Sequence, residues 1–164
     1  MNQELKKWTI AYVKHRDLTL KRIKTIDEDD KNNAVKVHFK DKTNIHFILD
    51  SLDANVFNLI KNVDQKTVVC LNKEDNFKFL IKEWKKFSEI KNFTIIFVNL
   101  QNDDKWLINP HVHSMIADPA SLEIGLRAMF DTANGKVIEI KQGKKKASIF
   151  EEGVDEMEDD SEEK

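Results

Sequence analysis

The sequence predicts a mixed α/β fold, in a single domain of two or three layers, followed by a disordered acidic tail. Three observations support this prediction. Apolar and polar residues alternate over much of the first fifty positions, which is typical of β-strands. A strand, an amphipathic helix and a second strand follow between residues 67 and 98, which indicates a right-handed βαβ unit with a parallel strand pair. No repeat of about 20–50 residues is present, which argues against solenoids and propellers.

The first fifty residues are predicted to form an antiparallel β-meander of three or four strands. Residues 8–13 are rich in β-branched and aromatic side chains, and residues 18–26 alternate apolar and basic ones, so we expect both to be strands. Residues 34–39 and 45–49 are two further apolar runs separated by a short polar turn. This arrangement predicts an antiparallel hairpin.

After this meander the apolar period changes from two to 3.6. The spacing predicts a short helix over residues 56–63, opened by Asp53 or Ser51 as its N-cap. Residues 67–71 form a short continuous apolar run, which is typical of a buried strand.

A long helix is predicted over residues 73–90, with Asn72 as its cap, apolar side chains on one face and lysines on the other. Residues 93–98 have the clearest strand pattern of the chain and are predicted to form a strand. A short extended segment over residues 105–108 is expected to pair back on that strand.

The last predicted helix begins at Asp118-Pro119, because Asp is a preferred cap and Pro is favoured at the first helical position. Gly135 is expected to end this helix in the left-handed conformation. Residues 137–140 are predicted to be a final short strand, so the predicted order of elements is ββββ-α-β-α-β-β-α-β.

Composition places the chain among ordinary globular domains. Its 164 residues match one domain, and ten Phe and three Trp are sufficient for a hydrophobic core. Cys70 is the single cysteine, so an internal disulfide is excluded, and its apolar strand indicates core packing rather than a nucleophile. The N-terminal residues do not read as a signal peptide, and no apolar run is long enough for a membrane span. We therefore expect a cytoplasmic protein that does not interact with membranes.

The net charge of −2 conceals a strong asymmetry along the chain. Residues 151–164 contain nine acidic side chains and one basic one, whereas residues 1–150 contain 26 basic and 20 acidic side chains. The chain is thus a basic body with an acidic appendage. We expect a globular domain over residues 1–143 and a disordered tail, first basic and then acidic, over residues 144–164.

Basic residues concentrate near the N-terminus and after the last predicted strand. Lysines and arginines gathered on one surface attract phosphate backbones, so this set predicts a nucleic-acid-binding surface. The alternative is an ordinary solvated surface. The candidate residues are Lys6, Lys7, Lys14, Arg16, Lys21, Arg22, Lys144, Lys145 and Lys146.

A second candidate site lies in the segment from Asn109 to Asp118. In an extended segment His111 and His113 would point to the same side, where two imidazoles can share a divalent metal ion and Asp118 can add an oxygen ligand. The alternative is an ordered loop in which the histidines form hydrogen bonds and Asp118 caps the following helix.

The predicted meander followed by strand, helix and strand places Asp50 and Asp53 ahead of Lys73 in neighbouring parts of the sheet. At the level of the fold, this arrangement resembles the restriction-endonuclease-like nucleases. The resemblance implies an Asp on one strand and an acid-x-Lys on the next, which bind a divalent ion at the scissile phosphate. The chain departs from that pattern because Leu71, not an acid, lies two residues before Lys73. The metal-binding pair is incomplete, and the implied site would be inactive.

These observations lead to three functional hypotheses. Because no complete catalytic set is present, we expect first a small non-enzymatic domain that contacts nucleic acid, alone or within a complex that handles it. The acidic tail would tune that contact by competing for the basic surface. The alternatives are a metal-dependent hydrolase or nuclease-like protein that uses His111, His113 and Asp118, and a protein-interaction module in a larger complex.

Overall fold

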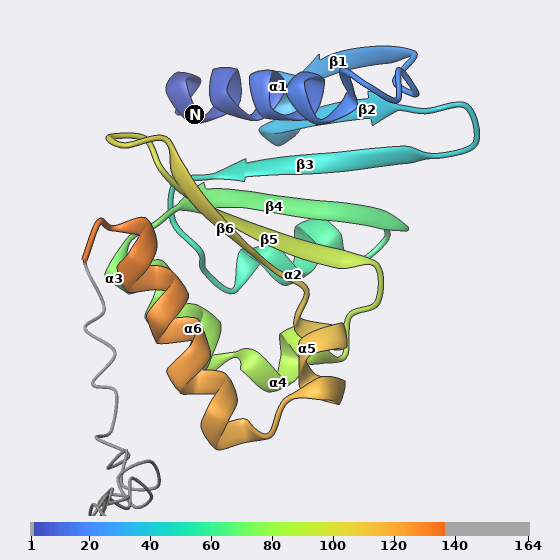
Figure 1. Ribbon diagram of the computed structural model, residues 1–164. Helices are drawn as coiled ribbons and strands as arrows, with labels where there is room; N and C mark the ends of the chain where they lie inside the picture. The colour runs from blue at the N-terminus through green and yellow to red at the C-terminus, as the bar shows by residue number, and fades with distance from the viewer. Residues whose placement is uncertain (1, 137–164) are drawn as a thin grey trace, which may run out of the picture.

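A six-stranded mixed sheet forms the centre of the molecule (Figure 1), and the computed structural model describes residues 2–136. Helix α1 lies on one face of the sheet, whereas α2, α3, α4 and α6 cover the other face and α5 packs against α4. The fold is thus mixed α/β with three layers. The elements in order are α1 (Gln3–Asp17), β1 (Thr25–Asp29), a 3-10 turn (Asp30–Asn32), β2 (Ala34–His38), β3 (Thr43–Leu49), α2 (Asn55–Ile60), β4 (Gln65–Leu71), α3 (Glu74–Lys82), α4 (Trp84–Ser88), β5 (Phe93–Asn99), β6 (Asp104–Ile108), α5 (Pro110–Ile116) and α6 (Pro119–Ala133).

The strands lie in sequence order from β1 to β6. The pairs β1–β2, β2–β3 and β5–β6 are antiparallel, and the pairs β3–β4 and β4–β5 are parallel. Helix α2 connects β3 to β4, and helices α3 and α4 connect β4 to β5. The predictions of a meander, of its hairpin, of a βαβ unit and of a return strand after residue 99 are confirmed.

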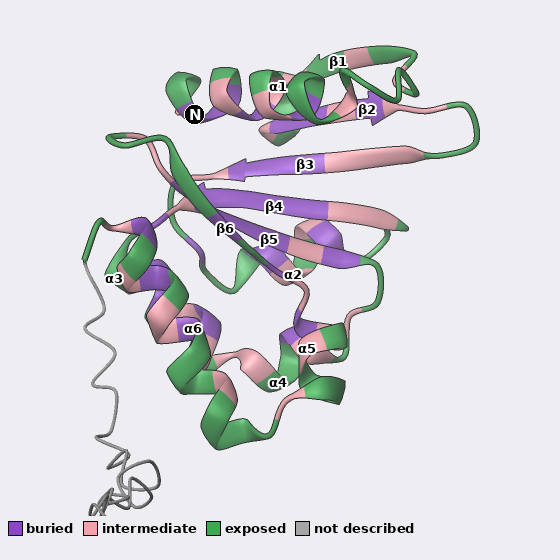
Figure 2. Ribbon diagram, in the orientation of Figure 1, coloured by how far each residue is buried: buried purple, intermediate pink, exposed green. Residues whose placement is uncertain are grey.

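Each face of the sheet has its own hydrophobic core, and the buried residues concentrate on the central strands (Figure 2). On one face, Leu5 and Val13 of α1 pack over buried valines and isoleucines of β2 to β5. On the other face the core is aromatic: Phe97 and Trp106 stack with their ring centroids 4.3 Å apart. Two separate cores explain why the chain needs helices on both faces of the sheet.

The prediction of a strand over residues 8–13 is wrong, because this segment belongs to α1. Leu5, Thr9 and Val13 are spaced by four and form the buried stripe of the helix. The Asn2 side chain accepts a hydrogen bond from the backbone N–H of Leu5 at 3.0 Å and caps the helix. The segment has strong β-propensity, but its N-cap and its apolar stripe favour a helix. The stripe can be buried against the sheet only when the segment is helical.

The strand predicted over residues 18–26 is also wrong over most of its length. Residues 18–24 form a turn and a loop, and β1 begins only at Thr25. Lys21 adopts a left-handed conformation with φ of 48°, which interrupts any extended run. The N-terminal part therefore has one helix and three strands instead of four strands.

The long helix predicted over residues 73–90 is divided at Glu83 into α3 and α4. Asn72 does not cap it: Lys73 occupies the N-cap position and makes no side-chain cap hydrogen bond. Asn72 is instead buried, where its amide accepts from the Trp106 indole N–H at 2.8 Å and donates to the Phe130 carbonyl at 3.1 Å. Asn72 therefore forms tertiary hydrogen bonds instead of capping the helix that follows it.

The C-terminal helix α6 has the predicted ends. The Asp118 carboxylate accepts from the Ser121 backbone N–H at 3.0 Å, and Gly135 has a φ of 74°. The predicted strand over residues 137–140 and the predicted tail over residues 144–164 lie outside the described residues.

Within residues 2–136, no helix combines the length and the hydropathy that crossing a membrane requires.

Candidate nucleic-acid interface

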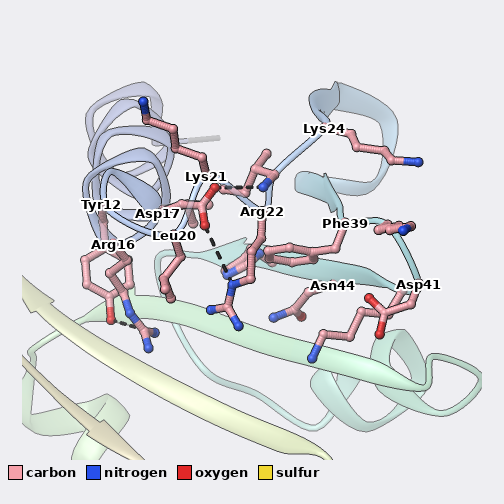
Figure 3. A pocket seen from close by; sticks show the side chains of 15 residues that line it. Tyr12, Arg16, Asp17, Leu20, Lys21, Arg22, Lys24, Phe39, Asp41 and Asn44 are labelled. Carbon is pink, nitrogen blue, oxygen red and sulfur yellow. Dashed lines mark hydrogen bonds and ion pairs between the residues drawn. The ribbon is translucent and has the colours of Figure 1, made fainter.

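A groove of about 950 Å³ opens between the C-terminal end of α1, the loop that follows it and the turn between β2 and β3 (Figure 3). Its volume is within the range of about 300–1,000 Å³ that is usual for small-ligand sites. We refer to it as the basic groove, and fifteen residues line it. They are Tyr12, Val13, Arg16, Asp17, Leu20, Lys21, Arg22, Ile23, Lys24, Phe39, Lys40, Asp41, Lys42, Asn44 and His46.

Short local interactions fix the two walls of the groove. The Asp17 carboxylate, at the last residue of α1, accepts a hydrogen bond from the backbone N–H of Ile23 at 2.7 Å, which folds the loop back on the helix. Backbone hydrogen bonds from Ile23 and Arg22 hold the pKa of Asp17 below its usual value. On the opposite wall, the backbone N–H of Phe39 donates to the Lys42 carbonyl at 2.8 Å and closes the turn.

The lining is strongly cationic. Six of the fifteen residues are basic and two are acidic, so the groove has an excess of four positive charges. Among the salt bridges of residues 2–136, Arg22 alone of these six basic residues takes part, at 3.9 Å from the Asp17 carboxylate. Such a concentration of cations raises the local concentration of anionic ligands. The six are Arg16, Lys21, Arg22, Lys24, Lys40 and Lys42.

Two aromatic rings lie among these cations. The Arg16 guanidinium is 5.6 Å from the ring centroid of Tyr12 and donates to its hydroxyl oxygen at 3.3 Å. The Lys42 amine is 5.9 Å from the ring centroid of Phe39. In Figure 3, Arg22 lies between α1 and Phe39, and Arg16 lies beside Tyr12. Cations beside aromatic faces are the combination that proteins use to bind the phosphates and bases of single strands.

The floor of the groove comes from β3. Asn44 and His46 are two residues apart and therefore lie on one face of the sheet, the same face as Ile48 and helix α1. His46 is buried, and its burial, followed by the positive charge of Arg16, lowers its pKa from 6.5 to about 4. The imidazole is therefore neutral at physiological pH.

The structure brings only part of the predicted basic set to this site. Arg16, Lys21 and Arg22 line the groove, whereas Lys7 and Lys14 are exposed on α1 and do not line it. Lys6 is buried, and its amine contacts the carboxylates of Glu28 and of Asp30, the latter at 2.6 Å. These two contacts raise the pKa of Lys6. Its positive charge is neutralised within the fold and does not contribute to the groove. The predicted residues Lys144, Lys145 and Lys146 lie outside the described residues.

The sequence reasoning missed Lys40, Lys42, Asn44 and His46. Lys40 and Lys42 were assigned to a polar turn, and their proximity to Arg16 and Arg22 depends on how α1 packs across the sheet. A sequence signal did exist for the floor, because Asn44 and His46 are polar at strand positions that share a face with the buried Ile48.

The structure changes the geometry predicted for the histidine segment. His111 and His113 lie in helix α5, so they point to different sides of it instead of sharing one side of an extended chain. The Asn109 side chain caps this helix and Pro110 occupies its first turn, a start signal that the sequence already contained. The extended conformation predicted for this segment is therefore wrong.

Both imidazoles interact with backbone carbonyls through Nδ1. His111 donates to the Ser88 carbonyl at 2.8 Å and links α5 to α4, and His113 donates to the Asn109 carbonyl at 2.7 Å. Asp118 caps α6. Within residues 2–136, no three His, Cys, Asp or Glu side chains are grouped so that they could hold a metal ion.

The carboxyl ends of the parallel strands β3 and β4, where ligands often bind in α/β folds, are closed by Asn76. Its amide accepts from the Leu52 backbone N–H at 2.7 Å and donates to the carbonyls of Asp50 at 3.0 Å and Leu71 at 2.8 Å. Asp53, one of the two acids in the nuclease resemblance, accepts from the backbone N–H of Asn55 at 2.8 Å. This edge of the sheet is thus occupied by structural hydrogen bonds.

Two other side chains have structural roles. Cys70 is fully buried in the core, and burial raises the pKa of its thiol well above the usual value. Arg127 pairs with the carboxylate of Glu74 through its two terminal guanidinium nitrogens, at 2.9 and 3.0 Å.

The basic groove is therefore the most distinctive site of the described structure, and its function is argued from its own chemistry. Comparison of the chain with protein-family models, with curated proteins and with solved structures found no match.

Proposed function

We propose that this chain is a non-enzymatic domain that binds nucleic acid through the basic groove. The observation that supports this proposal is the convergence of six cations from three separate segments on one hollow that also contains two aromatic rings. Phosphate contacts of this kind give affinity without sequence preference, and binding weakens as salt rises because counterions are released.

A charge-reversal experiment tests this role. Arg16→Glu, Arg22→Glu and Lys42→Glu are combined in one variant, and binding to a labelled oligonucleotide is measured by fluorescence anisotropy at several salt concentrations. We expect a loss of at least about tenfold in affinity and a decrease of about 2 in the slope of log K against log salt, since each phosphate contact contributes about 0.7–0.9.

The matched control reverses three exposed lysines on the opposite layer, Lys78, Lys82 and Lys85 of α3 and α4. It changes the net charge by the same amount away from the groove. If the control weakens binding as much as the groove variant, binding depends on net charge alone and the groove is not the site.

The acidic residues 151–164 are proposed to tune this contact. Nine carboxylates on the same chain compete with phosphates for the cationic lining, so a chain ending at Phe150 should bind nucleic acid more tightly at low salt. Equal affinities of the two chains across the salt range would count against this tuning, with circular dichroism confirming equal folding.

A second candidate, a protein-interaction module, is favoured by the apolar surface of α5 and α6. Met115, Ile116 and Ile124 are 66%, 74% and 73% exposed, and exposed apolar side chains mark contact surfaces when they are contiguous. Sedimentation velocity of the chain and of an Ile116→Ser, Ile124→Ser variant tests self-association through this surface. A monomer at all concentrations for both proteins would exclude a contact between copies.

A further inference from the structure

The floor of the basic groove is polar, whereas the part of that sheet face beneath Leu5 and Val13 of α1 is apolar. The strand register places His46 of β3 beside Thr67 of β4, and Thr67 beside Thr94 of β5, which gives a polar row across the three central strands. Asn44 lies two residues before His46 on the same face. In the adjoining core α1 covers valines and isoleucines, so the change to polar residues coincides with the groove.

Two atoms of this floor have no hydrogen-bond partner within the described part of the chain. They are Asn44 Oδ1 and His46 Nδ1, and both are shielded from water. The backbone of Val35 and Asn44 lies near enough to the His46 ring to oppose the lowering of its pKa, but it does not meet hydrogen-bond geometry at Nδ1. The Asn44 Nδ2 group reaches the Thr67 hydroxyl at 3.5 Å, so one end of the amide lacks a partner whichever way the amide is oriented. Buried polar atoms of this kind are costly to leave unpaired and are uncommon in native proteins. Their occurrence together in the groove indicates a bound group that supplies the missing partners.

The chemistry of the floor limits what that group can be. Phosphate oxygens only accept hydrogen bonds, whereas the amide of Asn44 and the neutral ring of His46 require both donors and acceptors. The edge of a nucleobase and the ribose 2′-hydroxyl provide both. The six cations of the lining, which form the rim of the groove, are suited to the phosphates. The ring of Phe39 is suited to stacking with a base, whereas the ring of Tyr12 is already stacked on Trp8.

Base pairing determines which form of nucleic acid fits. In a duplex the Watson–Crick edges are already paired and the bases are stacked, so a base can reach a recessed floor only after it has been unstacked. A single strand has no such cost. The groove volume of about 950 Å³ also suits one or two nucleotides rather than a duplex.

We propose that the floor formed by Asn44 and His46 receives the base or sugar of an unpaired nucleotide, so that the groove prefers single-stranded to double-stranded nucleic acid. This inference rests on the proposed function and adds its substrate class. The lining side chains that shield the floor must move aside. Leu20 is 57% exposed and Arg16 is also exposed, and such side chains change rotamer within picoseconds to nanoseconds.

The test uses the full-length chain with a labelled 12-nucleotide single strand, as RNA and as DNA, and with the duplex of the same sequence. The floor variant combines Asn44→Leu and His46→Leu. It should retain the thermal midpoint of the unchanged chain, because unpaired buried polar atoms are replaced by apolar groups of similar size. Its rim cations are unchanged.

We expect the wild-type chain to bind the single strand at least about tenfold more tightly than the duplex, which is the scale of satisfying one buried polar group. In the floor variant this preference should fall to about twofold or less, with duplex affinity unchanged. The rim variant Arg16→Glu, Arg22→Glu, Lys42→Glu should weaken binding to both forms.

Other outcomes separate the two proposals. If single strand and duplex bind equally and the floor variant changes neither affinity, the floor inference is wrong while phosphate binding stands. If the unchanged chain binds neither form, the proposed function fails as well. Suppose instead that the wild-type chain binds phosphatidylserine vesicles as tightly as it binds the single strand. If the rim variant then loses that binding, the groove is a surface for anions in general, and the preference for nucleotides is overturned.

Discussion

Protonation of His46 provides a quantitative test of the buried floor. The folded chain excludes the proton because burial and Arg16 lower the pKa of His46 from 6.5 to about 4, whereas the unfolded chain binds a proton below about pH 6.5. Stability is therefore fully present above pH 6.5 and is lost as the pH falls from 6.5 toward 4. Across this whole window the loss is about 3 kcal/mol, and at pH 5 it is about 2 kcal/mol.

The measurement is urea unfolding followed by tryptophan fluorescence, at pH 7.5 and at pH 5.0. The chain should lose about 2 kcal/mol of unfolding free energy between these values, with the urea dependence unchanged. A His46→Gln variant should lose less than about 0.5 kcal/mol, because Gln cannot be protonated in this range. The matched control is His15→Gln, on the exposed surface of α1, which should retain the full pH dependence.

The carboxylate of Asp29 titrates below this window. Lys36, followed by Asn32, holds the pKa of Asp29 at about 2, so its contribution is lost only as the pH falls below the usual range of a free aspartate. Equal stability of the chain at pH 7.5 and 5.0 would refute the conclusion that His46 is buried and neutral. A His46→Gln variant that retains the pH dependence would refute it as well.

Two further substitutions test the packing of the fold by urea unfolding. Asn76→Ala should cost about 3 kcal/mol, since it leaves the buried N–H of Leu52 and the part-buried carbonyls of Asp50 and Leu71 without their partner; a cost below about 1 kcal/mol would mean that water replaces the amide. Gly125→Ala should stabilise the chain by about 0.5–1 kcal/mol, because a Cβ at this exposed position in α6 meets no atom within 4 Å; a loss of stability would show that the position is not an ordinary helical site.

Local sequence patterns predicted an element correctly where its ends are set by residues close in sequence. The hairpin of β2 and β3 follows from two alternating runs around a short turn, and α6 follows from Asp118, Pro119 and the left-handed Gly135. These signals act through hydrogen bonds within a few residues, so no tertiary contact can easily reverse them.

Local patterns failed where two interpretations compete. The segment from Trp8 to Val13 has strong β-propensity, but its stripe of Leu5, Thr9 and Val13 is buried only when the chain is helical and lies on the sheet. The segment around His111 was read as extended, although the Asn109 cap and Pro110 already indicated a helix start. Propensity is a weak guide when packing decides which face is buried.

The sequence by itself determined the mixed α/β class, the hairpin, the βαβ unit and the separation of a basic body from an acidic end. Only the tertiary structure decided which cations act together. Lys6 is neutralised by carboxylates within the fold, whereas Arg16, Lys42 and His46 line one groove because α1 packs across the sheet. Charge composition is a property of the chain, but a binding site depends on distances between segments, and packing sets those distances.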